Sequence, residues 1–220
     1  MKITDGFSVF LNRPTGYRLF RWMVGGEFAW RTCLTDYVNP LPREKILDIG
    51  CGPADILNYL PRVNYTGLDI NKGYIRSAKQ RFGSRGRFLC CDVGKTLLEE
   101  EQGSFDLVLA MGLVHHLNDA QAGRLFELAR QALRPAGRLI TFDGCYVPGQ
   151  SRFVRWLLGR DRGKFIRSRE EYVKLASAEF TNVESHIRHD LLRVPYTHLI
   201  MHCCDSISVT EQRSHSVPGL

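Results

Sequence analysis

Short apolar runs alternate with amphipathic segments along the middle of the chain. Five runs have the length and composition of buried strands, and each is followed by a polar or helical stretch. These runs are residues 45–50, 65–70, 87–93, 105–112 and 137–144. The segments between them predict a helix from about Ala54, helices over 73–82 and 119–133, and a short helix before residue 105. Because strands alternate with helices through short connections, the pattern predicts a parallel sheet with crossover helices.

The flanks of this region carry different patterns. Residues 16–38 are spaced as an amphipathic helix with a break at Gly25 and Gly26. After the fifth strand come a basic helical segment, another helix, and strand-like runs at 182–191 and 197–204. We therefore expect one domain at 1–204, with a helical cap at 1–42 and a substrate-side insert at 148–180, followed by a flexible tail at 205–220.

Composition narrows the class of protein. The 220 residues are 44% hydrophobic and 24% charged, which predicts one packed globular unit. No apolar run approaches the roughly 20 residues of a membrane-spanning helix, and the N-terminus lacks the apolar core of a signal peptide. We expect a cytoplasmic protein without membrane insertion, whose seven cysteines are free thiols. The net charge of +7 fits an anionic small molecule or nucleic acid, and the oligomeric state is unknown.

The first strand ends in a glycine turn, ILDIGCGPADIL, whose neighbours argue against a phosphate ligand. Gly50 and Gly52 lie where the first strand-to-helix turn of an open parallel sheet meets its ligand. A dinucleotide site would need a third glycine where the chain has Asp55, and a backbone N–H where it has Pro53. Asp48 adds a negative charge beside the turn. The turn therefore predicts a ligand with a cationic end, such as S-adenosylmethionine.

Acidic residues also end the next two strands. Asp69 follows Asp48 by 21 residues, close to the offset at which an acidic side chain reaches ribose hydroxyls. Asp92 ends the third strand, where its carboxylate is expected to accept a hydrogen bond from the adenine amino group. The three carboxylates together predict a nucleoside with a cationic tail.

The motifs occur in an order that resembles a known superfamily. LDIGCGPA, YTGLDI, CCDV, FDLVLAMGLVHHL and LRPAGRLI resemble the class I S-adenosylmethionine-dependent methyltransferases over about residues 45–147. Within that superfamily the chain is similar to the small-molecule HHL branch, methyltransferase types 11 and 25. The resemblance implies a Rossmann-like, doubly wound α/β fold with a mostly parallel seven-stranded sheet, an antiparallel last strand and helices on both faces.

The resemblance also implies a cofactor, its contacts and a reaction. The cofactor would be S-adenosyl-L-methionine, and the reaction an in-line methyl transfer to a small-molecule acceptor, with a hydroxyl or carboxylate oxygen as the expected acceptor atom. The implied contacts are Asp48, Gly50, Cys51 and Gly52 for the methionine end, Asp69, Ile70, Asp92 and Val93 for ribose and adenine, and Met111 and Gly112 for the sulfonium.

Three residues after the fourth and fifth strands are candidates for the catalytic side. His115 and His116 are candidate general bases, with His115 expected nearer the acceptor; the alternative is that they are structural or line the pocket. Asp143 ends the fifth strand and is expected to orient the substrate or cap a turn. Since the fourth strand ends without a carboxylate, we expect no metal site there. We also assign no metal to the later histidines, His186, His189, His198 and His202.

The basic segment GRDRGKFIRSR lies in the expected substrate-side insert. Arg162 and Arg167 are predicted to pair with a carboxylate or phosphate of an anionic acceptor. The alternative interpretation is a solvated helix face.

Three other functions remain possible. An RNA or DNA methyltransferase would fit the basic charge, but the fourth strand lacks the Asn/Asp-Pro-Pro-aromatic signature of base amino methylation, so nucleic acid is disfavoured as a partner. A non-catalytic cofactor-binding scaffold is disfavoured because the acids at the strand ends are intact. A nicotinamide oxidoreductase is disfavoured by Pro53 and Asp55.

Overall fold

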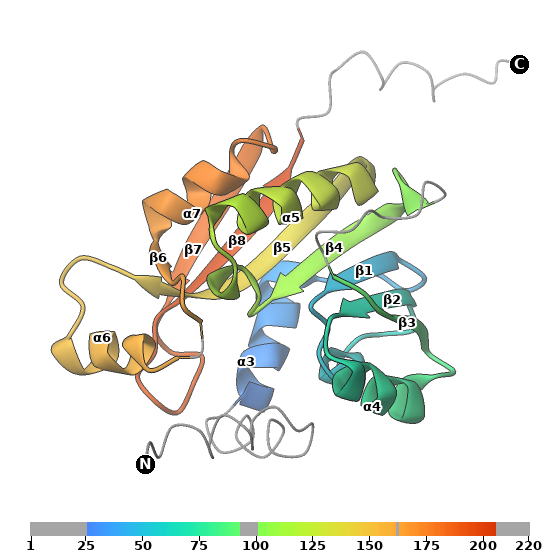
Figure 1. Cartoon of the computed structure of the whole chain (residues 1–220), viewed down its shortest axis with the longest axis horizontal. Coiled ribbons are helices and arrows are strands. Elements are labelled where there is room, and N and C mark those ends of the chain that lie inside the picture. Colours follow the sequence, from blue (N-terminus) through green and yellow to red (C-terminus); the bar gives the residue numbers. More distant parts are fainter. Residues whose placement is uncertain (1–25, 93–100, 162, 206–220) are drawn as a thin grey trace, which may run out of the picture.

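One mixed sheet organises the protein, whose computed structural model describes residues 26–92, 101–161 and 163–205. The strands lie in the order β3-β2-β1-β4-β5-β8-β7, and β6 pairs with the end of β5 (Figure 1). Their bounds are β1 Lys45–Ile49, β2 Asn64–Asp69, β3 Gly86–Cys90, β4 Phe105–Met111, β5 Leu133–Tyr146, β6 Arg167–Ser168, β7 Asn182–Arg188 and β8 His198–Cys204. Strands β1 to β5 are parallel, whereas β8 is antiparallel to β5 and β7.

The strand order reverses at β1, which makes the sheet doubly wound. The chain moves outward from β1 through β2 to β3 and then returns to place β4 on the other side of β1. The carboxyl ends of β1 and β4 therefore flank the crevice in which such sheets bind their ligands. The predicted fold, including the antiparallel last strand, is confirmed. The short strand β6 is an addition that no sequence pattern indicated.

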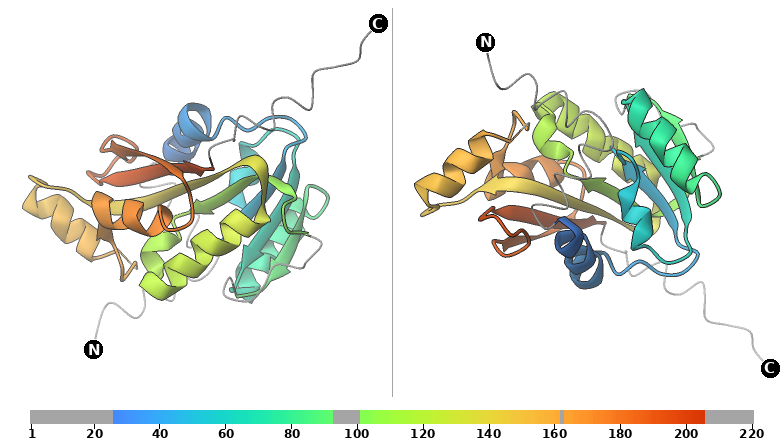
Figure 2. Two further views of the ribbon diagram at one scale, coloured as in Figure 1. Left: turned by 90° about the horizontal axis from the view of Figure 1, so that it is seen from above. Right: turned by 90° about the horizontal axis from the view of Figure 1, so that it is seen from below.

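Helices cover both faces of the sheet. The helices α5 (Asp119–Ala132) and α7 (Arg169–Ala176) lie on one face, and α3 (Gly26–Cys33) lies on the other (Figure 2). Successive residues of a strand point to opposite faces. Ile46 of β1 accordingly packs in the apolar cluster that includes α3, and Leu47 packs in the cluster that includes α5.

Side-chain caps fix where two of the helices near the ligand edge begin. Asn71 accepts hydrogen bonds from two backbone N–H groups at the start of α4 (Lys72–Phe82). Asn118 and Gln121 form a capping box at the start of α5. The loops between these helices and the strands before them are therefore held at both ends. The structure also contains the helix α6 (Arg152–Gly159), the π-helical turn η1 (Leu34–Val38) and the 3-10 turn η4 (Val114–His116).

The helix predicted from about Ala54 is wrong. The chain forms only a single 3-10 turn there, η2 (Asp55–Asn58). Ala54 has a left-handed backbone with φ of 56°, and Pro61 disfavours a helical conformation at the residue before it. The connection from β1 to β2 is therefore mostly loop.

Some predictions fall on residues that the structure does not describe. The expected cap is described only from residue 26, so its first 25 residues lie outside, as does the tail beyond residue 205. The short helix expected before residue 105 falls largely on residues 93–100, which are also outside. Among the helices that are described, none has the length and apolar character needed to cross a membrane.

Candidate active site

Left-handed backbone shapes the glycine turn after β1. Gly50 and Gly52 have φ angles of 73° and 56°, which glycine adopts without strain. The N–H of Gly50 donates to the carbonyl of Leu68 at 2.8 Å and so ties the turn to β2. A Cβ atom on Gly50 would lie only 2.9 Å from Cδ2 of Leu113, just beyond β4. The absence of a side chain at position 50 therefore lets the two strand ends approach closely.

Asp48 lies buried beneath this turn, and one of its carboxylate oxygens lacks a partner. The hydroxyl of Tyr65 donates to Oδ2 at 2.5 Å, whereas Oδ1 has no hydrogen-bond partner among the described residues. Burial raises the pKa of Asp48 to about 7, against the opposing effect of the Tyr65 hydrogen bond. Asp48 lines a pocket together with Gly52 and Met111. A cationic group bound there would pair with Oδ1 and favour the ionised carboxylate.

Asp69 links the end of β2 to the glycine turn. Its carboxylate accepts hydrogen bonds from the N–H groups of Gly52 at 2.9 Å and Asn71 at 2.7 Å, and burial raises its pKa. The next residue, Ile70, exposes 70% of its surface, which is unusual for a large apolar side chain. Asp69 therefore holds the turn in place from the same edge at which Ile70 offers an apolar surface.

The predicted cofactor contacts divide into three groups. Asp48, Gly50, Cys51, Gly52 and Met111 line one pocket. Asp69, Ile70, Asp92 and Gly112 lie at the carboxyl ends of β2, β3 and β4, beside that pocket in the fold. Val93 lies outside the described residues.

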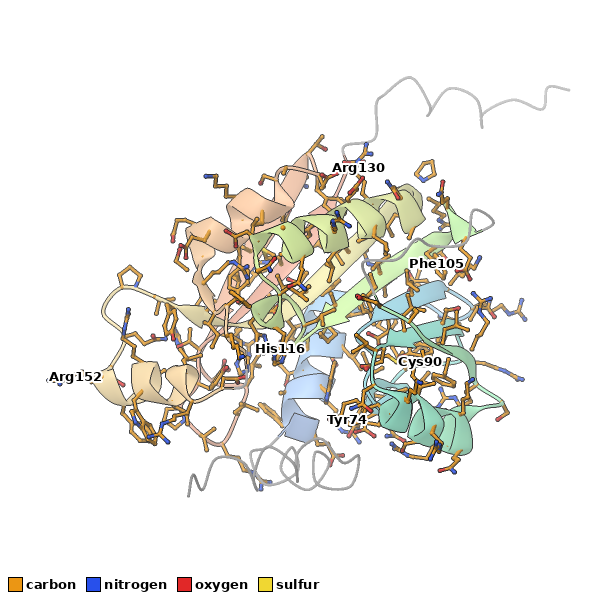
Figure 3. The ribbon with its side chains drawn as sticks, in the orientation of Figure 1. Tyr74, Cys90, Phe105, His116, Arg130 and Arg152 are labelled. Carbon is orange, nitrogen blue, oxygen red and sulfur yellow. The ribbon has the colours of Figure 1, made fainter. Side chains whose placement is uncertain are left out.

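His115 lies beyond the carboxyl end of β4, between two carboxylates. Its Nδ1 lies 2.8 Å from Oδ1 of Asp143, and its Nε2 lies 3.6 Å from Oδ1 of Asp161. Burial lowers the pKa of His115, but the hydrogen bonds and charges of the two carboxylates outweigh burial and raise it to about 9. The neighbouring ring of His116, labelled beside the end of β4 in Figure 3, has its centroid 4.3 Å from that of His115.

Asp161 is a site residue that the sequence analysis missed. It follows α6, and its Oδ1 accepts the N–H of Gly163 at 2.9 Å while its Oδ2 accepts the hydroxyl of Tyr196 at 2.8 Å. Burial raises the pKa of Asp161, but these bonds and His115 outweigh burial and hold it well below the usual range. Asp161 therefore connects the insert to the end of the sheet.

His198 is a second missed residue. It is 4% exposed at the start of β8, and its ring lies between those of Phe142 and Tyr196, with centroids 4.5 and 4.7 Å away. Burial lowers its pKa to about 3, so the ring is neutral, and Nδ1 has no hydrogen-bond partner among the described residues. Trp30 of α3 stacks on Phe142 at 6.5 Å and connects this aromatic group to the cofactor-side pocket.

The prediction that Arg167 binds a substrate anion is wrong. Arg167 is 7% exposed, and its guanidinium donates to the carboxylate of Asp119 at 2.8 and 3.0 Å. The same guanidinium donates to the carbonyls of Val114, Leu117 and Phe165. These bonds occupy the N–H groups of the guanidinium and hold the segment around η4 in place. Arg167 therefore stabilises the backbone that carries the site. Arg162, its partner in that prediction, lies outside the described residues.

The fold and this arrangement of strand-end residues define a class of proteins. A doubly wound sheet with a glycine turn after β1 and acids at the ends of β1 and β2 is the arrangement of the class I S-adenosylmethionine-dependent methyltransferases, and the chain contains a methyltransferase domain of this kind. The model of the family described as a methyltransferase domain matches residues 46–137. The predicted similarity to the type 25 branch is thereby confirmed.

Known relatives carry different activities. The chain is 35% identical to malonyl-[acyl-carrier protein] O-methyltransferase of Paenibacillus sp. over 44% of its own length and 37% of the relative's. It is 28% identical to phosphoethanolamine N-methyltransferase 1 of Triticum aestivum, over 86% and 41% of the two lengths. The chain thus spans well under half of the length of each of these two relatives.

A solved structure shows the same fold. Phosphoethanolamine N-methyltransferase 2 of Haemonchus contortus, in complex with phosphomonomethylethanolamine and S-adenosylhomocysteine, superposes with a TM-score of 0.72. The sequence identity is 16%, and the match covers 91% of this chain and 61% of that one.

Proposed function

We propose that this protein transfers the methyl group of S-adenosylmethionine to a small-molecule acceptor. The observation that carries the proposal is Oδ1 of Asp48, which is buried at the glycine turn beside a pocket and has no hydrogen-bond partner in the described part of the chain. A buried polar atom without a partner is costly unless a ligand satisfies it. The relatives act in the same way, since their names describe methyl transfer to oxygen or nitrogen.

The residues of the cofactor side fit such a ligand. Asp48 would pair with the amino group of the methionine part, Asp69 with ribose hydroxyls, and Ile70 would cover the adenine; Asp92 and Val93 are proposed to bind the adenine edge. When bound, S-adenosylmethionine supplies an activated methyl group on a sulfonium. Met111 and Gly112 are proposed to flank that sulfonium and to leave its methyl group open to the acceptor.

The acceptor side favours positioning over proton removal. Nδ1 of His115 contacts the carboxylate of Asp143 and Nε2 faces the carboxylate of Asp161, so neither ring nitrogen is directed at an acceptor proton. An acceptor that is already nucleophilic at neutral pH needs only alignment and exclusion of water. We therefore propose a carboxylate oxygen as the acceptor atom, with His116 and the aromatic group of Phe142 and His198 lining its path. Methylation of a nitrogen is the second candidate, because a relative acts on an amine.

Calorimetric titration with S-adenosylhomocysteine tests the cofactor site. We expect binding by the wild type, and a loss of at least tenfold in affinity for Asp48→Asn and Asp69→Ala. Asp36→Asn is the matched control, since this exposed acid on η1 lies away from the glycine turn. No binding by the wild type, or equal binding by all variants, would refute the site.

Product analysis tests the reaction. Mass spectrometry of reactions with labelled S-adenosylmethionine and panels of carboxylic acids, phenols and amines should detect labelled methyl esters. Labelled N-methyl products alone would replace the oxygen proposal by the nitrogen one.

A further inference from the structure

Three side chains of types that can bind a metal ion lie close together beyond the end of β4. They are His115 and His116, at the end of η4, and Asp161, after α6, and one donor atom from each lies within 4.8 Å of the others. The Nε2 atom of His115 and Oδ1 of Asp161 are 3.6 Å apart, longer than an ordinary hydrogen bond. Two ligands bound at about 2.1 Å to one tetrahedral ion are about 3.4 Å apart. This pair of atoms therefore has nearly the spacing of two ligands on one ion, and a donor atom of His116 lies within 4.8 Å of the other two ligand groups.

His115, which is buried, and Asp161, which is half-buried, are held by further hydrogen bonds. Asp143 contacts Nδ1 of His115 at 2.8 Å, which leaves Nε2 directed toward Asp161. The hydroxyl of Tyr196 occupies the other oxygen of Asp161. Metal-bound histidines and carboxylates characteristically have such partners, because these partners set the orientation and basicity of the ligand atoms.

The loop that carries Asp161 is closely fitted to His115. A Cβ atom on Gly163 would lie 1.9 Å from Cδ2 of the His115 ring, so only glycine allows this approach. The N–H of Phe165 donates to the carbonyl of His115 at 2.9 Å and fixes the loop on the other side. The loop thus brings a carboxylate to the histidines from a distant part of the sequence.

We propose that His115, His116 and Asp161 bind one divalent transition-metal ion. Two imidazole nitrogens and one carboxylate suit Zn²⁺, Co²⁺, Ni²⁺ or Fe²⁺, whereas Mg²⁺ and Ca²⁺ prefer oxygen ligands. His116 is exposed, so the site has a path from solvent. Three protein ligands leave a coordination position open, which would take an anionic group of the acceptor. This last role rests on the proposed function, but metal binding itself does not.

Titration of the metal-free full-length protein with Co²⁺ and Zn²⁺ tests the site. We expect one ion per chain and visible absorption bands of four- or five-coordinate Co²⁺. Asp161→Asn and His116→Ala should each weaken binding by at least tenfold, and Tyr196→Phe by about tenfold through its effect on Asp161. His186→Ala on β7 is the matched control and should bind as the wild type does.

Three results would overturn the proposal: no binding by the wild type, unchanged affinity in both ligand variants, or a Co²⁺ spectrum with thiolate bands that disappear in Cys90→Ser/Cys91→Ser. Because His116 is exposed, its variant is expected to fold even if Asp161→Asn does not. S-adenosylhomocysteine binding, measured on the same samples, separates failure of the metal site from failure of the methyltransferase proposal.

Discussion

The free energy of ionising Asp48 links the stability of the fold to ligand binding. Its burial destabilises the charged form, so its pKa is raised to about 7 when no cation is present. In the ligand-free protein this costs folding stability as the pH rises from the ordinary range of a carboxyl to about 7. A bound ammonium group would reverse that cost, since it favours the ionised carboxylate.

The raised pKa of Asp48 should make ligand binding depend on pH. Binding of S-adenosylhomocysteine should release a proton from Asp48 below pH 7, so its affinity should fall as the pH falls through about 7, by up to about tenfold per pH unit at lower pH. Calorimetry in two buffers of different ionisation enthalpy measures the released proton directly. In Asp48→Asn the affinity should be lower and independent of pH over this range. An unchanged pH profile in the variant would show that another group titrates.

Arg167 leads to a prediction about stability. Arg167→Met keeps the apolar stem but leaves three buried or half-buried carbonyls without their donor. We expect the free energy of unfolding, measured by urea denaturation, to fall by about 3 kcal/mol, with the affinity for S-adenosylhomocysteine nearly unchanged. Arg169→Met, at an exposed neighbour, should change stability by less than about 0.5 kcal/mol. A higher KM for the acceptor without a loss of stability would instead restore the substrate-binding interpretation.

At the scale of elements, the loop after α6 positions the acceptor side. Gly163→Ala would push this loop or the His115 ring aside, because a Cβ atom would lie 1.9 Å from Cδ2 of His115. We expect the rate of methyl transfer to fall by tenfold or more, while S-adenosylhomocysteine binds as before. Gly159→Ala, at the end of α6, is the matched control, since a Cβ atom there would lie 4.0 Å from the hydroxyl oxygen of Tyr146. Equal rates in the two variants would show that the loop does not position the reacting groups.

Sequence patterns predicted the elements of the cofactor side well. The strand at 105–112 and the helices over 73–82 and 119–133 are dominated by local apolar periodicity, and each occurs as β4, α4 and α5. The helix from Ala54 failed because a left-handed residue and a proline outweigh a pattern that is otherwise compatible with helix. The local spacing of apolar residues was therefore sufficient to predict a helix or strand wherever the buried residues follow the period of that element.

The acceptor side could not be predicted in the same way. Asp161, Tyr196 and His198 come from a loop, from the segment before β8 and from β8 itself, and only the tertiary fold brings them to His115. The positive charge of Arg167 suggested an exposed side chain. The residues next to it in the sequence do not indicate that three backbone carbonyls surround its guanidinium in the folded chain. Such contacts between distant segments carry no periodic signal.

For the whole molecule, the position of β8 between β5 and β7 decides whether the sheet is complete. β8 pairs along its length with β5 on one side and β7 on the other, and Leu199, Ile200 and Met201 are buried. A chain that ends after Pro195 would leave β5 with an unpaired, apolar edge and β7 without a neighbour. We expect this chain to lose cooperative thermal unfolding, followed by circular dichroism, and to bind no S-adenosylhomocysteine. A cooperative transition in the shortened chain would show that the other strands fold independently.

The same strand order sets the sequence of events during synthesis on the ribosome. The strands β1 to β4 have all been synthesised by the time residue 112 has been added, whereas β7 has no strand to pair with until β8 follows it. In the nascent chain, β7 and one edge of β5 therefore remain unpaired while the N-terminal half begins to fold. β7 and β8 are the last strands to be made, and slow translation before β8 would prolong the stage at which the edges of β5 and β7 are unpaired and prone to aggregate.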